Sequence, residues 1–205
     1  MLRKFLVGGA AMILLTAPMS AVTGASAEVP GWFLSGSAAE KYVAFVDNSV
    51  AHEGSASGGL AAQTNVEGNE FGALMQLVDA RPHIGTRVRL SAHLRTAGVT
   101  TGAALWMRVD GVDGEVLSFD NMSRRGLIRG DQPWSMVEVV LDVPSESKVI
   151  SFGVLLKGEG MVWVDSVSLN PVLRHIATTG FDVEKRLPAV LGDLPHALSN
   201  LDFES

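Results

Sequence analysis

The chain has 205 residues, enough for one domain with a single hydrophobic core and too few for two full domains. It carries 16 Lys and Arg against 22 Asp and Glu, and the resulting net charge of -6 argues against binding to nucleic acid or to an anionic membrane surface. Because the chain contains no cysteine, disulfides, thiolate metal sites and cysteine nucleophiles are excluded.

Residues 1–27 have the pattern of an export signal. Arg3 and Lys4 precede an apolar run over 5–17, and residues 25–27, Ala-Ser-Ala, match the small-x-small pattern that signal peptidases cleave. The apolar run is shorter than the roughly 20 residues that a membrane-spanning helix needs. We therefore expect cleavage after residue 27 and a periplasmic or extracellular protein with no membrane insertion.

From Val43 onward the chain shows short apolar runs separated by Gly, Asp, Asn and Pro, which is typical of an all-β sandwich or barrel, and the predicted domain covers residues 28–171. The clearest alternation places Val88, Leu90, Ala92 and Leu94 between polar neighbours, as in an antiparallel sheet with one buried face. The predicted strands cover 72–78, 87–95, 103–110, 116–120, 135–143, 148–156 and 162–169, with a hairpin loop at 110–114 and a basic loop at 123–131.

Several segments resemble the jelly-roll carbohydrate-binding modules and their galactose-binding-like relatives. Residues 30–36 (PGWFLSG) resemble the family's early Gly-Trp strand, 52–57 (HEGSAS) its H-x-G-x-x-S loop, 133–144 its central strand after a tryptophan, and 160–169 (GMVWVDSVSL) its closing strand. The segments follow the family's order. The resemblance implies an antiparallel jelly-roll β-sandwich that acts as a secreted, non-catalytic binding module for glycan or another small polar ligand.

The resemblance also implies an opening strand of the type N-L-D-F-E, and here that pattern stands at residues 200–205. Residues 172–199 lack a sustained period and are expected to form a linker or wrapped arm, across which the last residues return and complete the sheet. Leu201 and Phe203 would then be buried and Asp202 exposed. One alternative is a frayed tail. Another is docking into a neighbouring copy, which would make the chain a self-associating structural or assembly protein.

Trp106 and Arg108 share one face of a strand whose other face is apolar. Arginine is rarely buried, so we expect this face to be exposed and Trp106 to offer a platform for a sugar ring, unless a neighbouring loop covers it. Asp120 and Asn121, at the end of another strand, can bind sugar hydroxyls, although both residue types are also common turn formers. These four residues form the predicted ligand site.

Asp165 interrupts an apolar strand, where a carboxylate is costly to bury unless it is paired or binds a cation. The family resemblance implies a structural Ca²⁺ near the first and last strands, which corresponds here to Asp165 and Glu204, with carbonyl groups of residues 53–56 as further ligands. The alternative is an Asp165 that faces solvent on an edge strand.

No catalytic signature is present in the sequence. It has no G-x-S-x-G or H-E-x-x-H motif, and no pair of carboxylates stands out as a glycosidase pair. We assign no catalytic residue and expect the protein not to be an enzyme. The remaining tryptophans, Trp32, Trp134 and Trp163, are expected to be structural, with Trp163 packed in the core. The alternative for Trp32 or Trp134 is a sugar-binding role at a loop rim.

Overall fold

The computed structural model describes residues 29–63, 66–180 and 198–204, so the predicted signal peptide lies outside the described residues. The described residues form nine strands and two 3₁₀ helices: β1 (Phe33–Gly36), η1 (Ala39–Lys41), β2 (Tyr42–Asp47), β3 (Ser57–Ala62), β4 (Phe71–Asp79), η2 (Arg81–His83), β5 (Arg87–Gly111), β6 (Val116–Asp120), β7 (Ile128–Asp142), β8 (Ser147–Lys157) and β9 (Met161–Val172). Within this part of the chain, no helix has the length and apolar character needed to cross a membrane.

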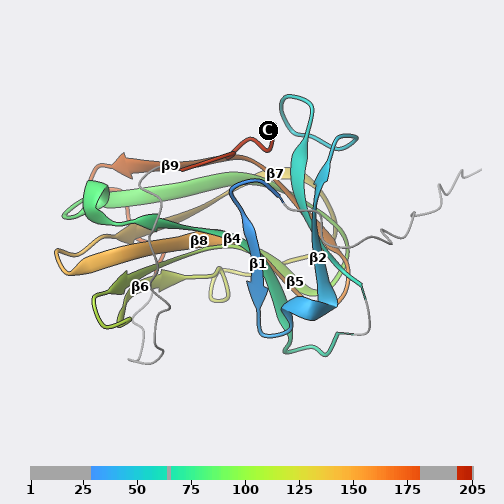
Figure 1. Cartoon of the computed structure of the whole chain (residues 1–205), viewed down its shortest axis with the longest axis horizontal. Helices are drawn as coiled ribbons and strands as arrows, with labels where there is room; N and C mark the ends of the chain where they lie inside the picture. The colour runs from blue at the N-terminus through green and yellow to red at the C-terminus, as the bar shows by residue number, and fades with distance from the viewer. Residues whose placement is uncertain (1–28, 64–65, 181–197, 205) are drawn as a thin grey trace, which may run out of the picture.

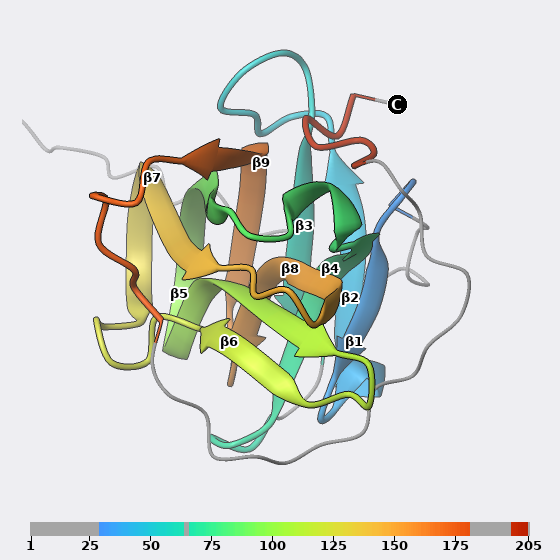
Figure 2. The same ribbon diagram turned by 90° about the vertical axis from the view of Figure 1, so that its left-hand side faces the viewer.

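The strands form an antiparallel jelly-roll sandwich whose two layers share the long strand β5 (Figures 1 and 2). The first half of β5 pairs with β7 and β9, and its second half pairs with β6 and β8. One layer therefore has the order β1-β4-β8-β5-β6, and the other β2-β3-β9-β5-β7. The predicted fold class is confirmed.

The sequence predicts two strands, 87–95 and 103–110, where the structure has the single 25-residue strand β5. The intervening residues contain Gly98, which adopts a positive φ of 61°. The register between β5 and β7 shifts at Thr96, Val99 and Ala103. Such irregularities bend a strand without ending it, so β5 can pass from one layer to the other.

Each of the other predicted strands overlaps an observed strand, and β6 has the predicted bounds. The hairpin loop between β5 and β6 is confirmed, because the Gly111 amide donates to the Glu115 carbonyl at 2.8 Å and closes the turn. The basic loop is shorter than predicted, since β7 already begins at Ile128. The prediction missed β2 and β3, and β3 reads Ser-Gly-Gly-Leu-Ala-Ala, with no β-branched or aromatic residue.

The hydrophobic core lies between the layers. Val88, Leu90, Ala92 and Leu94 are buried as predicted, while their polar neighbours in β5 are partly or fully exposed. In the second half of β5 the same alternation turns Leu105, Met107 and Val109 inward. The residues between them therefore lie on the outer face of the β1-β4-β8-β5-β6 layer.

Residues 198–204 return to the sandwich, as predicted, and their side chains follow the predicted alternation. Phe203 is fully buried, Leu201 is half-buried against the core, and Asp202 is exposed. The prediction that this segment is a strand is wrong. Asn200 (φ 44°) and Phe203 (φ 60°) have left-handed backbone conformations, which interrupt the extended geometry that a strand requires.

Hydrogen bonds attach residues 198–204 to the sandwich. Trp32 Nε1 donates to the Asn200 carbonyl at 2.9 Å, and the Asn200 side-chain amide donates to the Pro30 carbonyl at 2.9 Å. Gln76 Nε2 donates to the Ser199 carbonyl at 2.5 Å. The described start of the arm is also attached, because the Thr179 amide donates to a carbonyl of β7 at 2.8 Å. The C-terminal residues are thus part of the folded domain.

Candidate functional site

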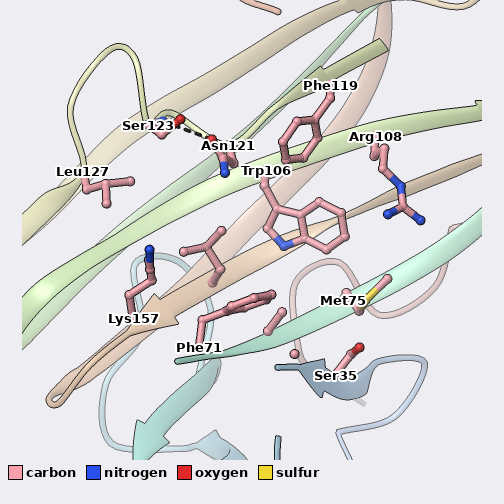
Figure 3. A pocket seen from close by; sticks show the side chains of 13 residues that line it. Ser35, Phe71, Met75, Trp106, Arg108, Phe119, Asn121, Ser123, Leu127 and Lys157 are labelled. Atoms are coloured by element: carbon pink, nitrogen blue, oxygen red, sulfur yellow. Dashed lines mark hydrogen bonds between the residues drawn. The ribbon is translucent and has the colours of Figure 1, made fainter. Parts of the chain in front are cut away.

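A pocket of about 420 Å³ lies on the outer face of the β1-β4-β8-β5-β6 layer (Figure 3). This volume lies within the roughly 300–1,000 Å³ range of small-molecule sites. Residues from β1, β4, β5, β6, β8 and the loop after β6 line it. Its walls combine aromatic rings at Phe71, Trp106 and Phe119 with polar groups at Ser35 and Asn121. The pocket can therefore hold a ligand that has both an apolar face and hydrogen-bonding groups.

Trp106 and Arg108 both line this pocket from β5, so their predicted common face is confirmed. In the strand register, Gly153 of β8 lies opposite Trp106, and Phe119 of β6 lies opposite Arg108. Figure 3 shows the indole at the centre of the site, with Arg108 on one side and Lys157 on the other.

The exposure predicted for Trp106 is wrong, because the side chain is only 9% exposed. Phe71, Phe119 and Leu155 line the same pocket and pack with it, so the indole forms a wall rather than a projecting platform. Among the described residues, its Nε1–H has no hydrogen-bond partner although it is shielded from solvent. An unpaired buried donor costs roughly 1–3 kcal/mol, and such groups are uncommon in folded proteins.

Asn121 lines the pocket as predicted, but Asp120 does not. The Asn121 side-chain oxygen accepts the Ser123 amide at 3.2 Å, which fixes the turn after β6 and leaves the amide nitrogen directed toward the pocket (Figure 3). Asp120 is buried, and its carboxylate accepts hydrogen bonds from the Met122 amide at 2.8 Å and from Arg125 at 2.7 Å. Asp120 therefore holds the turn and lies outside the lining of the pocket.

The charges in the pocket are all positive. Among the described residues that line it, Arg108 and Lys157 are basic and none is acidic. Arg108 Nε donates to a carboxylate oxygen of Asp110 at 2.9 Å. Burial raises the pKa of Asp110, and the guanidinium of Arg108 partly opposes this shift. Lys157 forms no ion pair with any residue that the structure describes, so its charge is uncompensated in the pocket.

The side chains of Asp165 and Glu204, the predicted calcium ligands, both contact the loop of residues 52–56. Asp165 is buried in β9, an inner strand, so the solvent-facing alternative is wrong. One of its oxygens accepts the amides of His52 at 2.6 Å and Glu53 at 3.0 Å. Glu204 accepts the amides of Ser55 at 2.7 Å and Ala56 at 2.9 Å, and these bonds, together with the Ser55 hydroxyl, lower the pKa of Glu204.

This arrangement does not fit Ca²⁺. The loop presents N–H and O–H donors to both carboxylates, whereas Ca²⁺ needs oxygen acceptors from several groups. The described part of the chain contains no group of three or more Asp, Glu, His or Cys side chains placed to hold a metal. Calcium binding stays a prediction that a titration can test, and the geometry gives it no support.

Of the other tryptophans, Trp134 is half-buried in β7, where its ring centre lies 5.9 Å from that of His52 and its side chain lines a second pocket. Trp32 is buried against Phe203 and Phe152, as expected. Trp163 is buried as expected, but it lies outside the main core cluster: its Nε1 donates to Asp47 at 2.9 Å, and the Arg95 guanidinium lies 5.4 Å from its ring centre. Since Arg95 is exposed on the outer face of β5, Trp163 lies on the outer face of the second layer.

No family model matches the chain. A protein of Bacillus subtilis (strain 168) named "Uncharacterized HTH-type transcriptional regulator YbfP" is 41% identical over 177 residues. The match covers 86% of this chain and 57% of the relative, so the chain spans little more than half of that protein's length.

Two solved structures share the fold at low sequence identity. The enzymatically active domain of bacteriophage CBA120 tailspike protein 4 has a TM-score of 0.54 and 14% identity, over 71% of this chain and 20% of that one. The tandem CBM22-1-CBM22-2 domain of Paenibacillus barcinonensis Xyn10C has a TM-score of 0.52 and 15% identity, over 69% of this chain and 41% of that one. The chain therefore has the β-sandwich fold found in carbohydrate-binding modules.

Proposed function

We propose that the chain is a non-catalytic binding protein that holds a glycan, or another small polar ligand, in the pocket around Trp106. The observation that carries the proposal is the combination of an indole wall with polar groups on both sides of it, at Arg108, Asn121 and Lys157. A sugar ring has an apolar face that packs on an aromatic ring and hydroxyls that need hydrogen-bond partners. The pocket offers both.

The unpaired Nε1–H of Trp106 also supports a ligand at this place. Folded proteins rarely leave a buried donor without a partner unless a ligand, water or functional role accounts for it. Because Trp106 lines the pocket, an oxygen of a ligand that reached Nε1 there would accept this proton. The donor would then contribute to affinity and to the orientation of the ligand.

The predicted signal sequence favours a site of action outside the cytoplasm, where an exported binding module meets extracellular glycans. Expression of the full chain in a bacterial host, followed by N-terminal sequencing of the exported fraction, tests this part of the proposal. We expect the mature chain to begin at Glu28. Full-length protein confined to the cytoplasm would contradict export.

The Bacillus subtilis relative favours a second candidate, the ligand-sensing domain of a transcriptional regulator. The described residues contain no α-helix, so no helix-turn-helix lies in that part of the chain. Direct contact with DNA is also disfavoured by the net charge of -6. Both candidates use a ligand pocket, and the export experiment separates them because a transcriptional regulator must remain with the DNA.

The assembly alternative depends on the C-terminal segment, which in the structure docks through contacts with residues such as Trp32 and Gln76. Self-association would require the same segment to leave its place and enter a second copy. Light scattering across a wide concentration range tests this. We expect a monomer at all concentrations, and oligomers that disappear when residues 198–205 are deleted would favour assembly.

Binding itself is tested by titrating the purified protein with a broad saccharide panel and following intrinsic tryptophan fluorescence. We expect at least one saccharide to bind, and Trp106→Phe to weaken its binding. Trp163→Phe is the matched control, because Trp163 has almost the same exposure, 8% against 9%, on the opposite layer. A panel in which no saccharide binds would overturn the proposal.

A further inference from the structure

We propose that the ligand of the Trp106 pocket is an acidic saccharide, with a uronic acid ring against the indole and its carboxylate paired with Lys157. This inference rests on the proposed binding function and names its ligand class. Three features of the pocket support it: the positive charge of its lining, the ion pair that Arg108 forms with Asp110 and that Lys157 lacks among the described residues, and the positions of Arg108 and Lys157 on either side of the indole.

The positive charge of the pocket is not a general property of the surface, because the whole chain has a net charge of -6. Some basic side chains elsewhere in the described residues are paired with acids, as in Lys41 with Glu70 and Arg87 with Asp142, while Lys148 has no such partner but is exposed to solvent. Lys157 is half-buried, lines the pocket and has no such partner within the described chain. A partly buried charge is costly when unpaired, and a ligand carboxylate would compensate it.

The two cations of the pocket have different roles. Arg108 already donates its Nε–H to Asp110, whose side chain is 2% exposed, so a second carboxylate at this end would meet the charge of Asp110. The terminal nitrogens of Arg108 are suited instead to neutral hydroxyl oxygens. Charge recognition is therefore assigned to Lys157 and hydroxyl recognition to Arg108.

The positions of these groups match the shape of a uronic acid. Its carboxylate projects from one edge of the ring, and hydroxyls project from the opposite edge. Figure 3 shows Lys157 and Arg108 on opposite sides of the Trp106 indole. A ring packed on the indole can thus direct its carboxylate to Lys157 and its far hydroxyls to Arg108, while Asn121, on the Lys157 side, donates to a further oxygen.

The test uses pairs of ligands in which esterification removes the charge: short oligomers of galacturonate, glucuronate, mannuronate and guluronate, each beside its methyl ester. Sulfated oligosaccharides form a further arm. Calorimetry gives Kd for each. We expect at least one uronate to bind about tenfold or more tighter than its ester. The preference should shrink as salt is raised, because a partly exposed ion pair is screened.

Three variants test whether Lys157 is the residue that recognises the ligand carboxylate. Lys157→Met should reduce the preference for acid over ester to less than about twofold, whereas Lys157→Arg should retain most of it. Lys148→Met is the control, because Lys148 is an exposed lysine of the same strand outside the pocket, and it should leave the preference unchanged. Melting curves of all three verify that they are folded.

The results of these experiments distinguish a failure of the acidic-ligand inference from a failure of the proposed saccharide binding. Acid and ester bound with equal affinity, or a preference that survives Lys157→Met, would overturn the inference while saccharide binding stands. Tighter binding of a sulfated ligand than of every uronate would overturn the carboxylate assignment. A protein that binds no saccharide, neutral or acidic, would overturn both proposals.

Discussion

The ring of Phe203 stacks on the indole of Trp32, with ring centres 5.0 Å apart and ring planes 26° apart, although the two residues come from opposite ends of the described chain. Trp32 also meets Phe152 of β8 edge-on at 5.9 Å. This aromatic chain ties the C-terminal residues to the middle of the β1-β4-β8-β5-β6 layer. The last residues therefore contribute to stability in the way a core strand does, without forming one.

Replacing Phe203 with alanine should lower the free energy of unfolding by about 3–5 kcal/mol, the usual loss for a fully buried aromatic side chain. Asp202→Ala is the control, because Asp202 is exposed and its change should stay within about 0.5 kcal/mol. Urea denaturation of both variants measures the difference. Equal stability of the two variants would show that the tail does not hold the core.

A side chain at Gly58 of β3 should clash with the ring of Phe203. A Cβ at this position would lie 2.3 Å from Cε1 of the Phe203 ring. Gly58→Ala should therefore destabilise the domain by about 1–3 kcal/mol, and the penalty should shrink in a Phe203→Ala background. Gly68→Ala is the control, since a Cβ there meets nothing within 4 Å. Additive losses in the double variant would contradict the contact.

Glu204 should make stability depend on pH in the acid range. Its hydrogen bonds with Ser55 and Ala56 lower the pKa of Glu204 in the folded protein below the ordinary value of 4.5. Its contribution is therefore present above that value and is lost as the pH falls through the folded-state pKa. The stability difference between wild type and Glu204→Gln should be constant from pH 7 to about 5 and shrink at lower pH.

Glu159→Gln is the control for this comparison, because Glu159 is exposed and its carboxylate has no hydrogen bond within the described residues. Its stability difference from wild type should stay small across the range. A Glu204→Gln difference that grows as the pH falls would have the wrong sign and would contradict the assigned hydrogen bonds.

Calcium should leave the melting temperature unchanged. The amides of residues 52–56 donate to Asp165 and Glu204, so at these contacts the loop offers N–H groups to the two carboxylates and not the oxygen ligands that Ca²⁺ needs. Differential scanning calorimetry in excess calcium and in excess chelator measures this. A melting temperature that rises with calcium, and loses that rise in Glu204→Gln, would restore these two residues as ligands.

The fold could be predicted wherever the two faces of a strand differ in polarity, as they do along residues 87–95. β3 was missed because its glycines reflect tertiary contacts: Gly58 makes room for Phe203 and Gly59 for Phe45. A sequence motif predicts that the C-terminal segment, residues 198–204, returns to the sandwich, but it does not predict the backbone conformation of that segment. Left-handed conformations are unusual for non-glycine residues; Asn200 belongs to a type that adopts them more often, but a bulky residue such as Phe203 rarely does.

The site was predicted in part because Trp106, Arg108 and Asn121 lie on one strand face and at one strand end. Phe71 and Lys157 were missed because they enter the pocket through the register between β4 and β8, where they lie opposite each other. Register depends on the pairing of distant strands, so no local pattern reveals it. The burial of Trp106 was missed for the same reason, since the side chains that pack on it come from other strands.

The central claim, that a saccharide binds against Trp106, is tested most directly by NMR of the indole N–H groups. The chain has four tryptophans, so the spectrum should show four indole signals, and the Trp106→Phe variant assigns one of them. We expect the Trp106 signal to shift on titration with the best ligand of the saccharide panel, while the signal of Trp163, on the outer face of the other layer, stays in place. A titration in which the ligand binds and the Trp106 signal does not move would contradict the claim.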